Sequence, residues 1–296
     1  MNDDWPALPY EQWKDTYATL HMWSQVVGKV ALAKGPPLNH SWGSALRLTS
    51  RGFETPVLSH GSRRFTIAFD LVDHHLVIAA SDGDRRTIPL APRPVADFYR
   101  EVMATLDGMG LPVRIWSMPV EIESPIRFEE DTIHHAYDPI YANRVWRILL
   151  QVERVLTASR CGFLGKTSPA NFFWGAFDLA LTRFSGRPAP PREGPAFQRD
   201  AYSHEVISHG FWPGNKDMEA AFYSYTAPEP AGLAEATVLP ASAFYSKEQK
   251  EFFLLYEEVI KPDSSGSAEK TLMDFFQSTY EAGADLAHWD RAALER

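Results

Sequence analysis

Residues 65–90 read FTIAFDLVDHHLVIAASDGDRRTIPL, and this stretch decides the fold. Large apolar residues alternate with smaller or polar ones over Phe65–Leu71 and again over Leu76–Ala80. A period of two is typical of a strand with one buried face. Asp82–Gly83 favours a tight turn, because both residue types tolerate a positive φ. The stretch therefore predicts an antiparallel meander whose third strand carries Ile88.

Apolar residues at three- and four-residue steps predict helices on both sides of this meander. The predicted helices run over Tyr10–Lys34, from Pro94 to about Gly108, from Asp138–Pro139 onward, and over about 268–286 with Ser267 as cap. A second strand-rich block is predicted over about 171–256, interrupted by an exposed proline-rich loop at 186–191.

The order helix, strands, helix occurs twice, and short stretches agree at matching points. Asn39–Gly43 reads NHSWG and Asn171–Gly175 reads NFFWG, each just before an apolar run. We therefore predict an α+β fold of two related units, each an antiparallel sheet with helices on one face, joined into one compact body. The predicted units are residues 1–125 and 126–296. A cleft between two such halves is a usual place for a ligand.

Composition narrows the classes of function. The formal net charge is −9, and basic residues form no extended cluster, which argues against a nucleic-acid partner. Residues 1–13 lack the pattern of a secretory signal, and no apolar run approaches the roughly 20 residues that cross a membrane. The single Cys161 fits a reducing compartment, so we expect a cytoplasmic protein. The oligomeric state is left open.

Three patterns resemble metal or phosphate sites. His204 and His209 stand five residues apart, whereas a zinc-binding helix needs a spacing of four. The run Glu129–Asp138 is rich in acidic residues and histidines, but acidic residues before a helix usually face solvent at its positive end. Gly162–Thr167 lacks the first glycine of a phosphate loop. We therefore expect neither a metal nor a cofactor.

The matched tryptophans suggest a ligand pocket. Trp42 and Trp174 each follow an asparagine by three residues and precede a glycine. Large aromatic residues mostly pack in a core, but the equivalent placement makes both candidates for lining a shared pocket. His204 is the candidate general base, because the ordinary pKa of histidine lies near neutrality, and Glu205 would orient it. The predicted ligand-binding residues are Asn39, Trp42, Arg147, Asn171, Trp174 and Trp212.

Polar residues also recur along two of the predicted helices. His21, Gln25 and Lys29 follow one another at four-residue steps on the first helix, and Asn143, Arg147 and Gln151 do so on the third. Such stripes either face water or converge on a shared site.

Several stretches resemble a bacterial family classed as a domain of unknown function. They are ATLHMW at 18–23, MPVEI at 118–122, FFWG at 172–175 with FDLA at 177–180 and TRFSG at 182–186, and YSHEVIS at 202–208 with GFWPG at 210–214. The resemblance spans nearly the whole chain. It implies no substrate and no catalytic residues.

Two hypotheses of function follow, and neither decides whether the chain is an enzyme. The first is a small-molecule binding protein or unclassified enzyme with its pocket between the two halves. The alternative is a non-catalytic interaction or scaffold protein, whose aromatic residues form the core and whose proline-rich loop at Pro188–Pro195 binds a partner protein.

Overall fold

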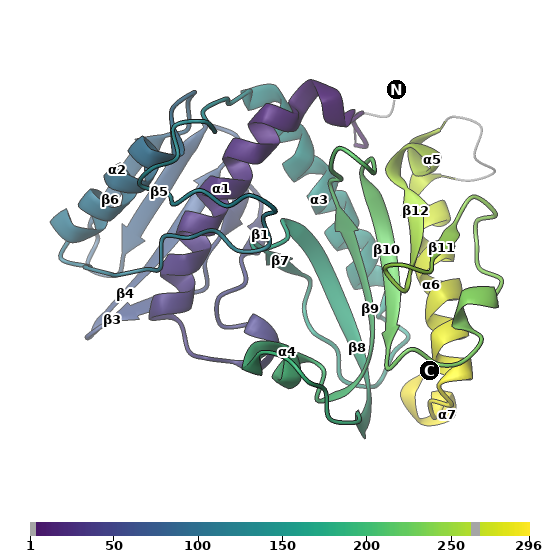
Figure 1. The fold of residues 1–296 in the computed structure, drawn as a ribbon. Coiled ribbons are helices and arrows are strands. Elements are labelled where there is room, and N and C mark those ends of the chain that lie inside the picture. The colour runs from purple at the N-terminus through teal and green to yellow at the C-terminus, as the bar shows by residue number, and fades with distance from the viewer. Residues whose placement is uncertain (1–3, 262–266) are drawn as a thin grey trace. The chain divides into compact units, whose positions relative to one another are not determined.

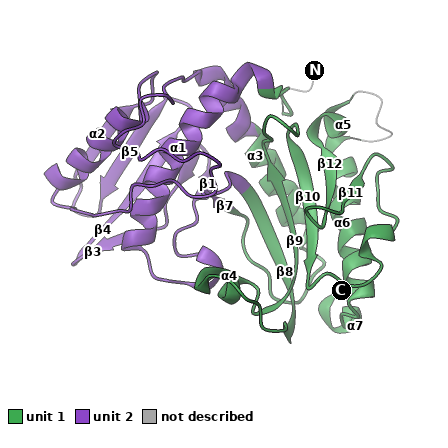
Figure 2. Cartoon of the chain, viewed as in Figure 1, with its two compact units in different colours: residues 1–10, 148–171, 179–296 green, residues 11–147, 172–178 purple. Residues whose placement is uncertain are grey.

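The computed structural model describes residues 4–261 and 267–296. These residues form two six-stranded sheets with antiparallel strand pairs, together with several helices (Figure 1). The predicted α+β class is therefore confirmed. The chain divides into two compact units (Figure 2). Unit 1 comprises Met1–Tyr10, Ile148–Asn171 and Leu179–Arg296, and unit 2 comprises Glu11–Arg147 and Phe172–Asp178.

The meander predicted over residues 65–90 lies in the sheet of unit 2. Its strands follow the order β1-β2-β4-β5-β6, and β3 pairs with β4. They are β1 (Arg47–Thr49), β2 (Gly52–Glu54), β3 (Leu58–His60), β4 (Arg63–Asp70), β5 (His75–Ala80) and β6 (Arg85–Pro89).

The alternation in sequence becomes the two faces of this sheet. Phe65, Ile67 and Phe69 on β4 are each at most 2% exposed, whereas the residues between them are partly exposed. Ile67 pairs with Ile78 on β5, so the apolar positions of the two strands lie on the same face. Gly83, in the turn to β6, has φ of 92°, which confirms the predicted tight turn.

Helices α1 (Tyr10–Lys34) and α2 (Val95–Gly108) complete most of unit 2, and both lie in front of strands β3 to β6 in Figure 1. The bounds of α1 are those predicted. Trp23 on α1 stacks on Phe98 of α2 with ring centroids 4.7 Å apart. In the parts of the chain that the structure describes, no helix is both long and apolar enough to cross a membrane.

Helix α3 (Pro139–Ser159) begins at the predicted proline. Its residues up to Arg147 belong to unit 2 and the rest to unit 1. Ile140 donates its backbone N–H to Asp138 Oδ1 at 2.8 Å, which is the expected cap. Asn143 donates to the carbonyl of Leu71, just after β4, and Trp146 donates to the carbonyl of Thr49 on β1.

The second sheet has the strand order β11-β12-β10-β9-β8-β7. Its strands are β7 (Asn171–Phe173), β8 (Asp178–Pro188), β9 (His204–Trp212), β10 (Ala221–Ala227), β11 (Phe244–Ser246) and β12 (Glu251–Leu255). The predicted loop at 186–191 begins later than expected, because β8 continues to Pro188. Unit 1 also holds α4 (Ala196–Ala201), α5 (Tyr256–Ile260), α6 (Ala268–Leu286), α7 (Arg291–Leu294) and the 3-10 turn Leu233–Glu235.

Helix α6 matches its prediction at both ends and on its buried face. The Ser267 hydroxyl accepts a hydrogen bond from the backbone N–H of Lys270, which confirms the predicted cap. Leu272, Phe275 and Phe276 are fully buried. Their spacing places them on the side of α6 that packs on the second sheet, where Phe276 contacts Phe222 of β10 edge to face.

The stretches that suggested a duplication adopt different structures. Asn39–Ser41 forms a 3-10 turn, η1, whereas Asn171–Phe173 forms strand β7. A duplication is therefore not shown. The compact units also differ from a simple division of the chain, because residue 125 falls inside unit 2 and Phe172–Asp178 belongs to unit 2 as well.

Candidate functional site

The polar stripe on α1 is buried within unit 2. His21, Gln25 and Lys29 are 7%, 0% and 4% exposed, so the expectation that they face water is wrong. They lie on successive turns of α1, because four residues make slightly more than one helical turn. Two segments of the same unit cover them, residues 116–121 and residues 174–177.

His21 connects α1 to the second of these segments. Its Nε2 lies 2.8 Å from the carbonyl oxygen of Gly175, so Nε2 carries the proton and donates it. The imidazole stacks on Tyr17 at 5.8 Å and also contacts Phe177. Burial disfavours the charged imidazolium and lowers the pKa of His21 to about 4.

Gln25 connects α1 to the first segment through a two-way pair. Its Nε2 donates to the carbonyl oxygen of Val120 at 2.8 Å, and its Oε1 accepts from the N–H of Val120 at 2.9 Å. The carboxamide thereby satisfies both backbone groups of one loop residue. This pair fixes residues 118–121 against the helix.

Trp174 lies flat against α1 at Gly28. A Cβ at position 28 would fall 2.2 Å from the Trp174 ring, so only glycine leaves room for the indole. Trp174 Nε1 donates to the carbonyl oxygen of Ser44 at 3.0 Å. Trp174 is 9% exposed, with Gly28 against its ring and the Ser44 carbonyl bonded to its Nε1.

Lys29 ends between two tryptophans. Its Nζ lies 4.8 Å from the centroid of Trp116 and 5.9 Å from that of Trp174. No described residue offers this ammonium group a hydrogen bond or an ion pair. A ring face stabilises an ammonium by about 0.5–2 kcal/mol, whereas desolvating an ion costs several kcal/mol, so the neutral amine gains. Burial accordingly lowers the pKa of Lys29.

Glu121 carries the second unpartnered ionisable group of this region. It is a non-glycine residue with φ of 57°, a conformation that costs about 1–3 kcal/mol. Its Oε1 lies against Gly175, where an added Cβ would come within 2.4 Å of it. Although much of the residue is exposed, this contact desolvates the carboxyl group and raises its pKa. Among the described residues, none donates a hydrogen bond to the carboxyl group.

These contacts define what we call the Lys29 site, made of Lys29, Trp116, Glu121, Trp174 and Gly175. An amine and a carboxyl group stand there without partners, and their pKa values are shifted toward each other. The other polar groups, on His21, Gln25 and the Trp174 indole, are already hydrogen-bonded. Perturbed groups of this kind gather at functional sites.

Of the predicted ligand-binding residues, Trp174 alone belongs to the Lys29 site. Asn39 begins the η1 turn of the same unit, and Trp42 directly follows that turn. Trp42 is half-buried and its ring stacks on His40 at 5.4 Å. Arg147 is half-buried on α3. Whether these three bind a ligand stays a prediction.

Asn171, Trp212, His204 and Glu205 lie in unit 1. Asn171 is buried and donates through Nδ2 to the carbonyl of Pro169, and Trp212 is half-buried at the end of β9. Both stay predicted ligand-binding residues. The proline-rich alternative also lies in this unit, at the largely exposed residues 189–195.

The predicted catalytic pair begins strand β9. His204 is exposed, and its Nδ1 lies 3.2 Å from the hydroxyl of Ser203. The Glu205 carboxylate accepts two hydrogen bonds from the guanidinium of Arg187, at 2.7 and 2.9 Å. Consecutive strand residues point to opposite faces of a sheet, so the side chains of His204 and Glu205 diverge. Glu205 is paired with Arg187. The catalytic roles of both residues stay predictions.

Within the acidic run at 129–138, the Asp131 carboxylate accepts hydrogen bonds from the backbone N–H and the ring of His134. Asp131 is fully buried, which differs from the solvent-facing loop expected, and its Oδ2 accepts from His134 Nδ1 at 2.7 Å. The carbonyl of Asp131 in turn accepts from the N–H of Ala96 at the start of α2. Over residues 4–261 and 267–296, no three histidine, cysteine, aspartate or glutamate side chains are placed to hold a metal ion.

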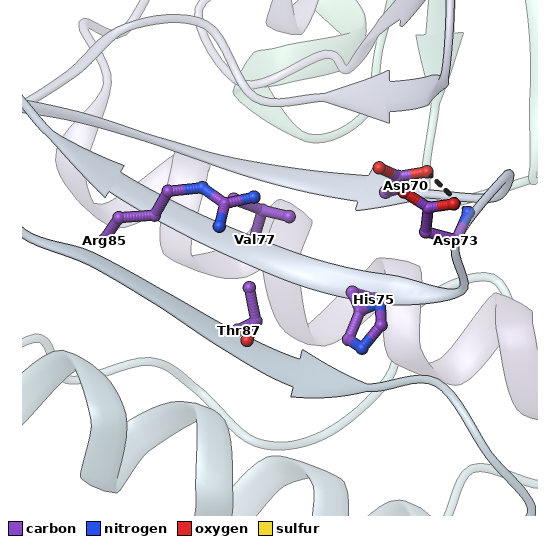
Figure 3. A pocket seen from close by; sticks show the side chains of 6 residues that line it. All are labelled: Asp70, Asp73, His75, Val77, Arg85 and Thr87. Atoms are coloured by element: carbon purple, nitrogen blue, oxygen red, sulfur yellow. Dashed lines mark hydrogen bonds between the residues drawn. The ribbon is translucent and has the colours of Figure 1, made fainter.

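A separate hollow of about 470 Å³ opens on the unit 2 sheet (Figure 3). The Arg51 guanidinium bridges two of its carboxylates, with 2.7 Å to Asp70 and 2.6 Å to Asp73. Both carboxylates of the hollow are therefore already paired. Its lining residues are Asp70, Asp73, His75, Val77, Arg85 and Thr87.

Sequence analysis missed Trp116 and Glu121. Residues 118–122 do belong to the stretches that resemble the family, and so do 18–23 and 172–175. His21, Glu121 and Trp174 represent these three stretches at the site, so the convergence of family-like stretches was a usable signal. The residue types around Glu121 give no sign of its left-handed backbone conformation.

Comparisons with known proteins agree with that resemblance and add no activity. No curated protein and no solved structure matches the chain. A family model described as "Family of unknown function (DUF5996)" matches residues 5–296. The match covers nearly the whole chain, so the protein belongs to this family of unknown function.

Proposed function

We propose that unit 2 binds a small organic molecule at the Lys29 site. One observation carries this proposal: Lys29 as a whole is 4% exposed, and its ammonium group has no hydrogen-bond or ion-pair partner among the described residues. Burying an unpaired charge is costly, and a ligand that supplies an oxygen atom to the amine relieves part of that cost.

The surroundings of Lys29 define the shape and polarity of this ligand. Trp116 is 63% exposed and Trp174 is held in place, so a flat or apolar group would pack on the open indole of Trp116. An oxygen of the ligand would face Lys29 Nζ. A hydroxyl or amine group would face the unpartnered carboxyl of Glu121. This pattern suits a small aromatic or unsaturated compound with oxygen substituents.

Thermal unfolding of the full chain tests the proposal directly. The screen contains aromatic aldehydes, oxo acids and phenols, and a compound present at 100 times its Kd should add about 2.7 kcal/mol of stability. Lys29→Met and Trp116→Ala should lose this gain. Lys34→Met is the matched control, because Lys34 also lies on α1 but is already bonded to the Pro112 carbonyl. A compound whose effect survives Lys29→Met would contradict the proposal.

His204→Ala serves a second purpose in the same screen. His204 is exposed in unit 1, so removing it should leave the stabilisation unchanged if the Lys29 site binds the compound. Loss of the effect in His204→Ala alone would support the predicted pair His204 and Glu205 instead.

Two further features of the protein belong to this proposal. The Cys161 thiol is exposed and unpaired, which supports a reducing compartment such as the cytoplasm. A duplicated origin is supported by the two six-stranded sheets, although the Asn39 and Asn171 stretches adopt different structures.

A further inference from the structure

We infer that Lys29 forms an imine with a small aldehyde or ketone, so that the Lys29 site takes a carbonyl compound. This inference rests on the proposed function, because it names the substrate class of the same site. It starts from the placement of the amine between two indoles and from the absence of any competing acceptor among the described residues.

The first step concerns the state of the amine. Only a neutral amine attacks a carbonyl carbon, and a lysine held in water is almost fully protonated at neutral pH. Lys29 is 4% exposed, with indoles beside its Nζ. This desolvation lowers its pKa, and each unit of lowering raises the neutral fraction about ten-fold.

The second step concerns what an anionic ligand would meet. Glu121 and the amine both contact the Trp174–Gly175 segment, the carboxyl at Gly175 and the amine at the Trp174 ring. The donors of His21, Gln25 and the Trp174 indole are already engaged. A carboxylate ligand would therefore find no help from His21, Gln25 or the indole in holding its second oxygen. A carbonyl group needs only the amine of Lys29.

The third step is the reaction itself. The lone pair of Lys29 Nζ attacks the carbonyl carbon, and the carbonyl oxygen takes up a proton to give a carbinolamine. The carbon–oxygen bond then breaks, the hydroxyl leaves as water with one more proton, and the carbon–nitrogen double bond forms. The sum is amine plus carbonyl compound giving imine plus water, with no change of oxidation state. Nζ gives up both protons that the oxygen gains, and the Glu121 carboxyl, which lies against Gly175 next to Trp174, would relay them.

Reductive trapping tests the inference on the full chain. The protein is incubated with 4-hydroxybenzaldehyde and, separately, with pyruvate, in the presence of cyanoborohydride at pH 7.5. The secondary amine that results is located by peptide mass spectrometry. We expect Lys29 to be modified several-fold faster than Lys34 or Lys270, whose ammonium groups are bonded to Pro112 and Asp274.

Variants and a denatured sample separate reactivity from folding. Lys29→Arg keeps the charge and cannot form the imine, so it should fold and lose the adduct at this position. Glu121→Gln should keep the modified position and slow its formation several-fold. In urea the preference for Lys29 should vanish, because it depends on the folded surroundings.

The outcomes distinguish this inference from the proposed function. Binding that depends on Lys29 without any faster trapping at Lys29 would overturn the imine and leave the binding proposal standing. Neither binding nor trapping would overturn both. Trapping at the same rate on Lys29, Lys34 and Lys270 would also reject the inference.

Discussion

The indole of Trp174 lies against Gly28 in the middle of α1, with no space for a side chain between them. An added Cβ at position 28 would stand 2.2 Å from the ring. The ring cannot retreat easily, because its Nε1 is bonded to the Ser44 carbonyl. A glycine inside a helix, which propensity alone disfavours, is therefore required by packing.

Gly28→Ala should destabilise the protein despite the better helix propensity of alanine. Propensity favours alanine by about 1 kcal/mol, but forcing a methyl group into a packed contact costs about 1–3 kcal/mol or more. Urea unfolding measures the difference. Gly108→Ala is the matched control, because nothing lies within 4 Å of a Cβ there, and it should be neutral or stabilising. Equal effects of the two substitutions would refute the packing argument.

Lys29→Met should stabilise the folded protein by about 1–3 kcal/mol, because it removes a buried charge that has no partner. Lys34→Met should instead cost about 1 kcal/mol, since the Lys34 ammonium donates to the Pro112 carbonyl. Opposite signs for two lysines on one helix would identify Lys29 as a position where stability is sacrificed. A loss of stability in Lys29→Met would argue that the ammonium group is better solvated than its burial indicates.

The advantage of Lys29→Met should shrink at alkaline pH. The pKa of Lys29 is lower in the folded than in the unfolded protein, so the unfolded chain holds the proton over the interval below 10.5. Unfolding therefore takes up a proton there, and wild-type stability rises with pH relative to the variant. Urea titrations at pH 7 and pH 10 measure this change. A constant difference between the two proteins would contradict it.

His21 should make the protein less stable in mild acid. Its pKa is about 4 in the folded state and about 6.5 when unfolded, so stability is complete above pH 6.5 and falls as the pH drops toward 4. The full difference corresponds to about 3 kcal/mol. His21→Gln should flatten this dependence without abolishing it, because the pKa of His40 is lowered by burial as well. Unchanged pH dependence in His21→Gln would show that another group dominates.

Trp174 and Trp116 should behave differently although both flank Lys29. Trp174→Ala removes a buried, hydrogen-bonded indole and should cost about 3–5 kcal/mol. Trp116 is 63% exposed, so Trp116→Ala should cost less than about 1 kcal/mol while still abolishing ligand stabilisation. Urea unfolding with and without ligand separates the two effects. A large stability loss in Trp116→Ala would make it a structural residue.

Much of the fold could be predicted from local patterns. The alternation of apolar residues predicted the faces of β4 and β5, and the three- and four-residue repeat predicted the bounds of α1. Pairing order was harder, because nothing local says that β3 pairs with β4 while β2 also does. The NHSWG and NFFWG stretches misled for a related reason, since three-dimensional context gives similar residues different backbones.

The candidate site was harder to predict than the fold. Lys29, Trp116 and Trp174 are far apart in the sequence, and no spacing rule brings them together. The stripe His21, Gln25 and Lys29 is visible in the sequence, but its spacing fits a solvent-facing side as well as a shared site. Helix α1 is buried around most of its circumference, and His21 and Gln25 find backbone partners in the two covering segments.

The pair between Gln25 and Val120 has a consequence for how this family can vary. Because Gln25 binds this loop through its main chain, substitutions at position 120 other than proline, which lacks the N–H, should leave the docking intact. Changes in loop length are another matter, because one inserted residue would present a different peptide group to Gln25. The number of residues between 116 and 121, rather than their types, keeps the Trp116 indole and the Glu121 carboxyl beside α1.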